Sequence, residues 1–230
     1  MGNTVCSEAR TDGRVLFLGI PDSGKTTALY YLKMKQTVIT IPTYGYNSEK
    51  ILTGKHIRDI WDIGGRVDDR DDYLYCMKNV AAIVYFIDCA AGHKRFSLAI
   101  NKLELMLAES ELENCAVAIA ANKQDLDTNI SIVDIKTLLS EKDWMKYRYW
   151  KVFPVTATAG TGFDIMLKWI DKHCWKVKKR PKEKPIKPKR KRRRWRRTVR
   201  HGSFIRHGKR KNRDTDSNVA MKFNHVVSVT

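Results

Sequence analysis

Short apolar runs and stretches with helical spacing alternate along the chain. Residues 15–18, 80–87 and 116–121 are continuous apolar runs, which are typical of strands covered on both faces of a sheet. Residues 56–61 alternate between apolar and polar positions, and residues 151–155 form a last short apolar run. We therefore predict a strand at each of these places, with the continuous runs fully buried.

The predicted helices lie between and after these strands. Residues 27–33 follow the first strand and a glycine-containing loop, and residues 96–112 carry an apolar face. Ser131 and Thr161, each with an aspartate three residues later, are expected to cap the next two helices. The apolar faces of the second and the last helix are expected to comprise Leu98, Leu103, Met106 and Leu107, and Phe163, Met166, Leu167, Ile170 and Cys174, respectively.

This alternation of strands and helices over residues 13–175 predicts one α/β domain. Its central sheet should be mostly parallel, with helices on both faces. The carboxyl ends of parallel strands meet at one edge of such a sheet, so the loops that follow them should lie together. The longest apolar run, residues 80–87, is too short to cross a bilayer.

Composition changes sharply after the predicted domain. The chain has 230 residues, 43% of them hydrophobic, which excludes a wholly disordered protein. Its net charge of +19 is concentrated in residues 176–213, which hold 21 Lys and Arg and one acidic residue, whereas residues 1–175 hold 22 of each sign. We expect an N-terminal segment (1–12), a folded domain (13–175), a disordered basic tail (176–213) and a polar C-terminal segment (214–230).

The basic tail should bind polyanions. Each Lys or Arg close to an anionic membrane contributes about 1 kcal/mol of binding free energy. The same charge would bind RNA or DNA phosphates without sequence preference, and residues 178–197 are also typical of a nuclear address. A solvated tail without a specific partner is the remaining alternative.

The N-terminal segment offers a second route to a membrane. Gly2 follows Met1 as myristoylation requires, although Cys6 stands where Ser or Thr is preferred. One acyl chain anchors only marginally, so the tail would supply the second signal. We expect a cytoplasmic protein that binds membranes peripherally through Gly2 and the tail; an unmodified N-terminus and a nuclear location stay open.

A glycine-rich loop follows the first predicted strand. Residues 19–26, GIPDSGKT, match the pattern GxxxxGK[ST], in which backbone N–H groups and a helix N-terminus point at phosphate oxygens. Lys25 would reach the β- and γ-phosphates, and Thr26 would offer its hydroxyl to Mg²⁺. A chance glycine loop is the alternative. The expected binding positions are Gly19, Asp22, Ser23, Gly24, Lys25, Thr26 and Thr27.

Three more motifs follow predicted strands. In DIGG, Asp62 can hold Mg²⁺ through water, and Gly64 or Gly65 can give a backbone N–H to the γ-phosphate. In NKQD, Asp125 can accept both N1–H and the exocyclic amino group of guanine, a donor pair that adenine lacks. The segment TAT, residues 156–158, can present an N–H to guanine O6. The expected residues at the base end are Asn122, Lys123, Asp125, Thr156 and Ala157. Together the motifs predict GTP or GDP with Mg²⁺.

With these motifs the sequence resembles the Arf/Arl (ADP-ribosylation-factor-like) small GTPases over residues 13–175, which implies a P-loop NTPase fold. Residues 41–47 (IPTYGYN) are similar to the family's IPTxGFN, and residues 61–65 (WDIGG) to WDxGGQ. The resemblance implies a monomeric, Mg²⁺-dependent GTP switch in membrane trafficking or signalling. It implies that Thr43 ligates Mg²⁺ and contacts the γ-phosphate when GTP is bound, with Lys25, Thr43 and Arg66 at the catalytic positions. Exchange factors, GTPase-activating proteins and effectors would then bind at Tyr44, Tyr46 and Trp61.

Two departures from the family pattern affect hydrolysis. Arg66 replaces the family's glutamine after WDxGG, and a guanidinium has five donors and no acceptor with which to orient water. In the loop, Pro21 and Asp22 stand within IPDS where the family has LDAA. We therefore expect slow GTP hydrolysis. Two alternatives stay open: a binding module or decoy that holds GTP for Arf partners, and a basic nuclear or RNA-binding protein with a regulatory G domain.

Overall fold

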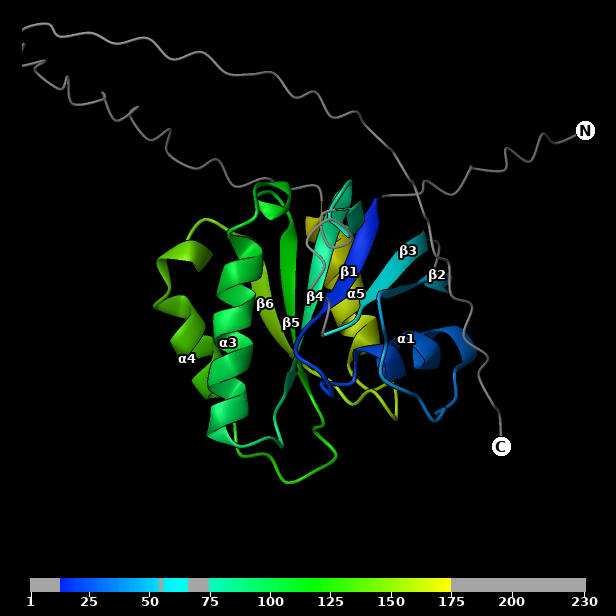
Figure 1. Cartoon of the computed structure of the whole chain (residues 1–230), viewed down its shortest axis with the longest axis horizontal. Coiled ribbons are helices and arrows are strands. Elements are labelled where there is room, and N and C mark those ends of the chain that lie inside the picture. Colours follow the sequence, from blue (N-terminus) through cyan, green and yellow to red (C-terminus); the bar gives the residue numbers. More distant parts are fainter. Residues whose placement is uncertain (1–12, 54–55, 66–74, 175–230) are drawn as a thin grey trace, which may run out of the picture. The chain divides into compact units, whose positions relative to one another are not determined.

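The computed structural model describes residues 13–53, 56–65 and 75–174. Six strands form one sheet in the order β2-β3-β1-β4-β5-β6 (Figure 1). β2 is antiparallel to β3, and the other neighbouring pairs are parallel, which confirms the predicted mostly parallel α/β sheet. The strands are β1 (Arg14–Leu18), β2 (Tyr46–Thr53), β3 (His56–Ile63), β4 (Val80–Asp88), β5 (Ala116–Asn122) and β6 (Trp150–Pro154).

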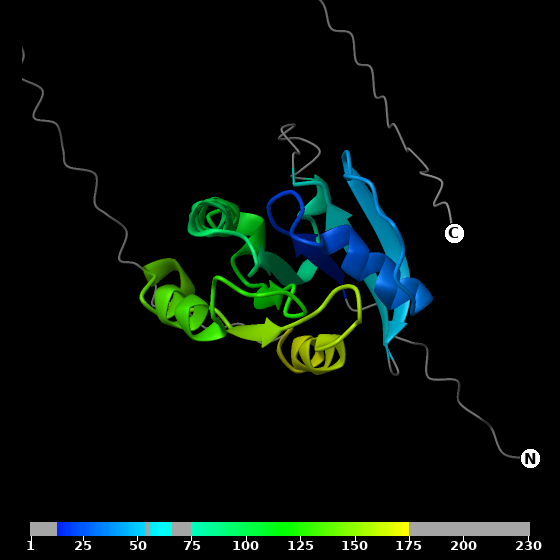
Figure 2. The ribbon, with the colours of Figure 1, turned by 90° about the horizontal axis from the view of Figure 1, so that it is seen from below.

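Helices cover both faces of the sheet (Figure 2). The helices are α1 (Lys25–Met34), α3 (His93–Leu107), α4 (Ile132–Ser140) and α5 (Phe163–His173), with short 3₁₀ turns at Ser110–Leu112 and Asp143–Met145. Leu16 and Leu18 of β1 pack on the side of α3 and α4, whereas Val15 and Phe17 pack on the side of α1 and α5. Successive side chains of a strand point to opposite faces, so a strand between two helical layers must be apolar at every position.

Buried polar groups tie the helical layers to the sheet. Tyr85 of β4 is fully buried and donates its hydroxyl hydrogen to the Ala99 carbonyl in α3 at 2.6 Å. Arg148, 3% exposed, donates to the carbonyls of Leu107, Leu112 and Glu113. These carbonyls end α3 and the 3₁₀ turn after it, so the guanidinium satisfies acceptors that the helix leaves without an intrahelical partner.

The structure corrects three expectations about these elements. The second predicted helix ends at Leu107, not at residue 112, and Leu98 is 55% exposed because Ala99 and Ile100 face the core instead. Thr161 does not cap α5: the helix begins after Gly162, which has a φ of 85°, and the Thr161 carbonyl accepts the Thr156 N–H. In contrast, the capping box of Ser131 and its partner Asp134 is confirmed.

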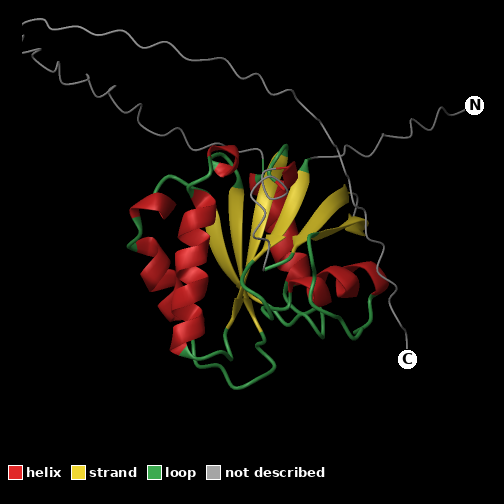
Figure 3. Ribbon diagram, viewed as in Figure 1, coloured by secondary structure: helices red, strands yellow, loops and turns green. Residues whose placement is uncertain are grey.

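Strand β2 was not predicted from the sequence. It lies at the edge of the sheet and pairs with β3 alone (Figure 3). Its sequence, YNSEKILT, is largely polar, and Ile51 is its one buried residue among those whose side chains are described. An edge strand held by backbone hydrogen bonds needs few apolar residues, so its pattern gives a weak signal.

None of the helices in the described ranges is both long and apolar enough to span a bilayer. The expectations for residues 1–12, Arg66, and residues 176–213 and 214–230 lie outside the residues that the structure describes.

Candidate functional site

The loop between β1 and α1 closes around the side chain of Lys25. Its ammonium group donates to the carbonyls of Gly19 and Ile20, at 3.1 and 3.0 Å, and only 5% of the residue is exposed. Burial lowers the pKa of Lys25, while the negative charges of Asp62 and Asp22 oppose that shift. The loop leads directly into α1, whose first N–H groups have no intrahelical partner. An ammonium group and free amides thus lie at one end of a helix, as anion binding requires.

The end of β5 supports this loop. Asn122 is buried, and its amide nitrogen donates to the Ser23 carbonyl at 2.8 Å. Gly24 has a φ of 91°, and a Cβ at this position would collide with the Asn122 amide. A glycine is therefore required at residue 24 on both counts. The Ser23 hydroxyl is buried and has no hydrogen-bond partner among the described residues.

Three predicted metal ligands meet beside Lys25. Thr26 donates its hydroxyl hydrogen to Asp62 Oδ2 at 2.6 Å, and the Thr43 hydroxyl lies 2.9 Å from that of Thr26 and 3.2 Å from Asp62 Oδ2. Asn47 donates to the Thr43 hydroxyl at 3.3 Å and thereby orients it. The three ligands come from α1, the segment before β2, and β3, so only folding brings them together.

This cluster suits Mg²⁺ bound together with a phosphate. Asp62 is fully buried, and its Oδ1 has no hydrogen-bond partner among the described residues. Burial raises the pKa of Asp62, and the hydrogen bond from Thr26 and the charge of Lys25 oppose that shift. Within the described ranges no three His, Cys, Asp or Glu residues gather into a metal site. One carboxylate with two hydroxyls fits Mg²⁺, which usually takes further oxygens from substrate phosphates and water.

The DIGG segment lies against the loop. The Gly64 N–H donates to the Gly45 carbonyl at 2.9 Å, so this donor is already engaged within the protein. A Cβ at Gly65 would collide with the backbone nitrogen of Pro21. Gly65 therefore lies directly beside the tip of the loop.

The NKQD and TAT segments meet at the other end of the loop. Asn122 Oδ1 accepts the Ala157 N–H at 3.0 Å, and the Thr156 N–H is given to the Thr161 carbonyl. Two of the three backbone donors of the 156–158 segment are thus engaged within the protein. Asp125 is exposed, and its Oδ2 accepts a long hydrogen bond of 3.4 Å from the Thr158 hydroxyl. Its carboxylate is the acceptor left open to a base.

The chain is similar in sequence to proteins of known family. The family model of the ADP-ribosylation factor family matches residues 3–174. The chain belongs to this family. It is 35% identical over 158 residues to ADP-ribosylation factor-like protein 1 of Drosophila melanogaster, covering 68% of this chain and 86% of that protein. It is 36% identical over 152 residues to ADP-ribosylation factor-like protein 14 of Mus musculus, covering 65% and 79% respectively.

A solved structure supports the fold of this Arf-family chain. The Arl6 BBS3 small GTPase from Trypanosoma brucei, with the bound nucleotide analogue GppNp, matches with a TM-score of 0.62. The match covers 71% of this chain and 98% of that one at 22% identity, so it concerns the fold alone. The protein is an Arf-type small GTPase, and membership of the family implies a GTP-binding switch and GTP hydrolysis.

Three supporting residues of this Arf-family chain were not identified from the sequence: Asp88, Asn47 and Arg95. Lys123 forms an ion pair of 2.7 Å with Asp88, which ends β4 and holds the NKQD segment. Asn47 orients Thr43, and Arg95 of α3 donates to the Pro21 carbonyl. Asp88 could have been found, because it ends a predicted strand at the same sheet edge. Asn47 is the last residue of the IPTYGYN motif, which could have pointed to it, whereas no local pattern marks Arg95.

The expected partner surface of the Arf-type switch is only partly exposed. Tyr44 is 73% exposed, with exposed Ile39 and Ile41 nearby in sequence. Trp61 is only 7% exposed, because Tyr46 stacks on it at 4.7 Å and the Arg14 guanidinium lies 4.0 Å from its ring centre. The expectation that partners contact Trp61 directly is therefore corrected: the buried indole packs against one face of the Tyr46 ring.

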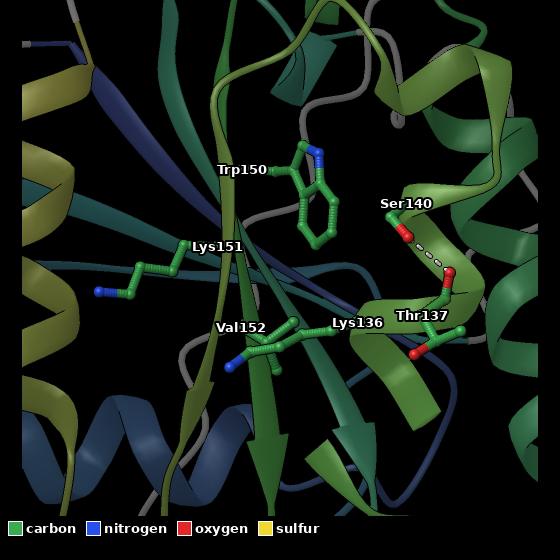
Figure 4. Close-up of a pocket in the computed structure, with 6 residues that line it drawn as sticks. All are labelled: Lys136, Thr137, Ser140, Trp150, Lys151 and Val152. Atoms are coloured by element: carbon green, nitrogen blue, oxygen red, sulfur yellow. Dashed lines mark hydrogen bonds between the residues drawn. The ribbon is translucent and has the colours of Figure 1, made fainter. Parts of the chain in front are cut away.

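A groove of about 370 Å³ lies elsewhere, between α4 and β6 (Figure 4). Its lining comprises Lys136, Thr137, Ser140, Trp150, Lys151 and Val152. The Ser140 hydroxyl donates to the Thr137 carbonyl, so it is already used within α4. The groove shares no residue with the site around Lys25, and we assign it no part in nucleotide binding.

Proposed function

We propose that this Arf-type GTPase is a Mg²⁺-dependent guanine-nucleotide switch that hydrolyses GTP slowly. The observation that carries the proposal is the convergence of Thr26, Thr43 and Asp62, whose side-chain oxygens approach within 3.2 Å of one another beside the buried Lys25. Hydroxyl and carboxylate oxygens next to an ammonium group and open helix amides suit a metal–phosphate pair and little else.

The residues of the site would bind different parts of the Mg²⁺–nucleotide complex. Lys25 would exchange its two loop carbonyls for β- and γ-phosphate oxygens, and Thr26 and Thr43 would hold Mg²⁺, with Asp62 acting through water. Bound Mg²⁺ neutralises phosphate charge. Because the Gly64 N–H holds the Gly45 carbonyl, the segment around Thr43 and the segment around Gly65 are joined. Contacts of Thr43 and Gly65 with the γ-phosphate would therefore order both segments together, and the ordered state is what partners would bind.

Binding of guanine nucleotide can be tested on the purified protein. Protein purified without added nucleotide should carry GDP or GTP, identified by chromatography after denaturation. GTP and GDP should displace a fluorescent guanine nucleotide, and ATP should not. Chelation of Mg²⁺ should speed release, because the cluster around Asp62 would lose its shared ion. Displacement by ATP as effective as that by GTP would contradict the proposal.

Hydrolysis is expected to be limited by Arg66. Arg66→Gln supplies an acceptor for the attacking water, and it should raise the single-turnover rate of GTP hydrolysis by at least about tenfold. Arg70→Gln, which removes the same charge nearby in sequence, is the control and should leave the rate unchanged. An unchanged rate in Arg66→Gln would show that another group limits hydrolysis. A wild-type rate near zero would favour the alternative of a GTP-holding binding module or decoy.

The partners and location that we propose follow from Tyr44, Tyr46 and the two ends of the chain. An exchange factor, a GTPase-activating protein and effectors would contact the exposed Tyr44 and the face of the Tyr46 ring that is turned away from Trp61. Myristoylation at Gly2 with the basic tail would place a monomer at cytoplasmic membranes, in trafficking or signalling. A nuclear or RNA-binding role of residues 178–197 is the competing proposal, favoured by their charge alone.

Binding to anionic surfaces should reside in the tail. Deletion of residues 178–230 should abolish binding to phosphatidylcholine vesicles that contain phosphatidylserine, and should leave nucleotide binding intact because α5 ends at His173. The lost binding should be the part that falls steeply with salt. Deletion of residues 214–230 alone is the control, since it spares the 21 basic residues. Vesicle binding that survives the longer deletion would contradict this role, and binding to RNA alone would favour the nuclear alternative.

A further inference from the structure

Arg95 joins α3 to the tip of the phosphate loop. It lies in the first turn of α3, and its Nη2 donates to the Pro21 carbonyl at 2.6 Å, across 74 positions of the chain. The same nitrogen lies 3.9 Å from Asp22 Oδ2. Pro21 and Asp22 belong to the IPDS segment, in which the loop departs from the family's LDAA. The contact therefore involves the part of the loop that is particular to this chain.

The helix itself gives no reason for an arginine here. A cation in the first turn lies at the positive end of the helix dipole, which is unfavourable. α3 has neither an acidic residue in this turn nor a side-chain cap that would compensate. The contact with the loop provides a gain outside the helix that offsets this cost for Arg95.

The tip of the loop depends on such support. Asp22 has a φ of 64°, in the left-handed region that residues other than glycine rarely adopt. Pro21 lies between two neighbours: the Arg95 guanidinium holds its carbonyl, and Gly65 packs against its nitrogen. Gly65 is the residue to which we assign the γ-phosphate contact. A shift of Pro21 would therefore change the γ-phosphate end of the site first.

We propose that Arg95 is a positioning residue that holds the loop tip against Gly65 and so favours GTP over GDP. This inference rests on the proposed function. The base end of the site is supported by other contacts, from Asn122 to Ser23 and to Ala157. Loss of Arg95 should leave that end intact, so GDP, which lacks a γ-phosphate, should be held nearly as before.

Arginine suits this task better than lysine. Its planar guanidinium carries several N–H donors in a fixed arrangement, so it can bond to a carbonyl and face a carboxylate at the same time. Lysine offers a single flexible ammonium group. Arg95→Lys should therefore keep only part of the effect.

The test compares release of GDP with release of GppNp, a GTP analogue that is not hydrolysed. Arg95→Ala should release GppNp about tenfold faster, the effect of losing one hydrogen bond to a charged group, and should change GDP release by less than about threefold. Arg95→Lys should lie between Arg95→Ala and the wild type. Lys94→Ala removes a neighbouring positive charge from the same turn and should change neither rate, since no described hydrogen bond or ion pair joins Lys94 to the loop.

The outcomes separate this inference from the proposed function. Equal acceleration of both nucleotides, or no change in either, would overturn the role of Arg95 and leave the switch itself intact. A wild-type protein that retains neither nucleotide would overturn the proposed function. If Arg95→Ala does not fold, Arg95→Lys decides, because wild-type release of GppNp from that variant would also overturn the inference.

Discussion

Asp125→Asn is expected to weaken GTP binding by about 10³-fold or more and to transfer the preference to xanthine nucleotides. A carboxylate accepts both donors on the guanine edge, whereas an amide accepts only one of them and turns its own NH₂ donor toward the other, and a site that leaves a substrate donor unpaired rejects that substrate by large factors. Xanthine carries a carbonyl in place of the amino group, to which the new amide can donate. Competition of GTP, XTP and ATP against a fluorescent nucleotide measures the change.

The exposed position of Asp125 means that this substitution should change base recognition without disturbing the fold. Its side chain is exposed and holds only the long hydrogen bond from Thr158, so the fold should not depend on it. Asp127→Asn is the matched control: it removes an exposed carboxylate two residues further on and should leave GTP binding unchanged. Unaltered nucleotide preference in Asp125→Asn would mean that another group recognises the base.

Arg148→Met is expected to lower the free energy of unfolding by about 3 kcal/mol. The guanidinium donates to three carbonyls at the end of α3 and in the turn after it, of which the Leu112 carbonyl also accepts the Cys115 N–H, and each lost hydrogen bond from a buried charged group costs about 1 kcal/mol or more. Methionine fills a similar volume, so the loss should come from hydrogen bonding more than from a cavity. Urea denaturation of the nucleotide-bound protein measures it.

A nearby exposed residue provides the comparison for Arg148. Lys146→Met removes a positive charge two residues earlier and should change the unfolding free energy by less than about 0.5 kcal/mol. If both variants had the same urea midpoint of unfolding as the wild type, the carbonyls at the end of α3 would have to be satisfied without Arg148.

Much of the phosphate and base site could be predicted because its residues follow apolar strands. The loop from Gly19 to Thr26 follows β1, and Asn122 ends β5, so each motif was placed by the strand before it. Parallel strands carry such loops to one sheet edge whatever the rest of the chain does. The convergence of Thr26 with Asp62 follows from that topology.

Other features depended on neighbours that no local pattern reveals. Leu98 and Ala99 are adjacent in α3, and only packing against the sheet decided that Ala99 faces the core. Trp61 looked accessible in a motif that partners bind, yet Tyr46 and Arg14 cover it. Such outcomes are set by side chains from other elements, so spacing along one element does not predict them.

By itself, the sequence determined the order of the elements other than β2 and the sheet edge at which the motifs meet, because apolar periodicity and short motifs are local properties. Tertiary structure alone decided which donors stay free and which distant residues support the site. In the folded protein the Ala157 N–H donates to Asn122, and the Arg95 guanidinium donates to the Pro21 carbonyl. The Asp125 carboxylate holds only a long hydrogen bond from Thr158 and stays open to a ligand. Hydrogen bonds between segments far apart in the chain depend on how close the fold brings two atoms, and that distance exists only once the helices have packed on the sheet.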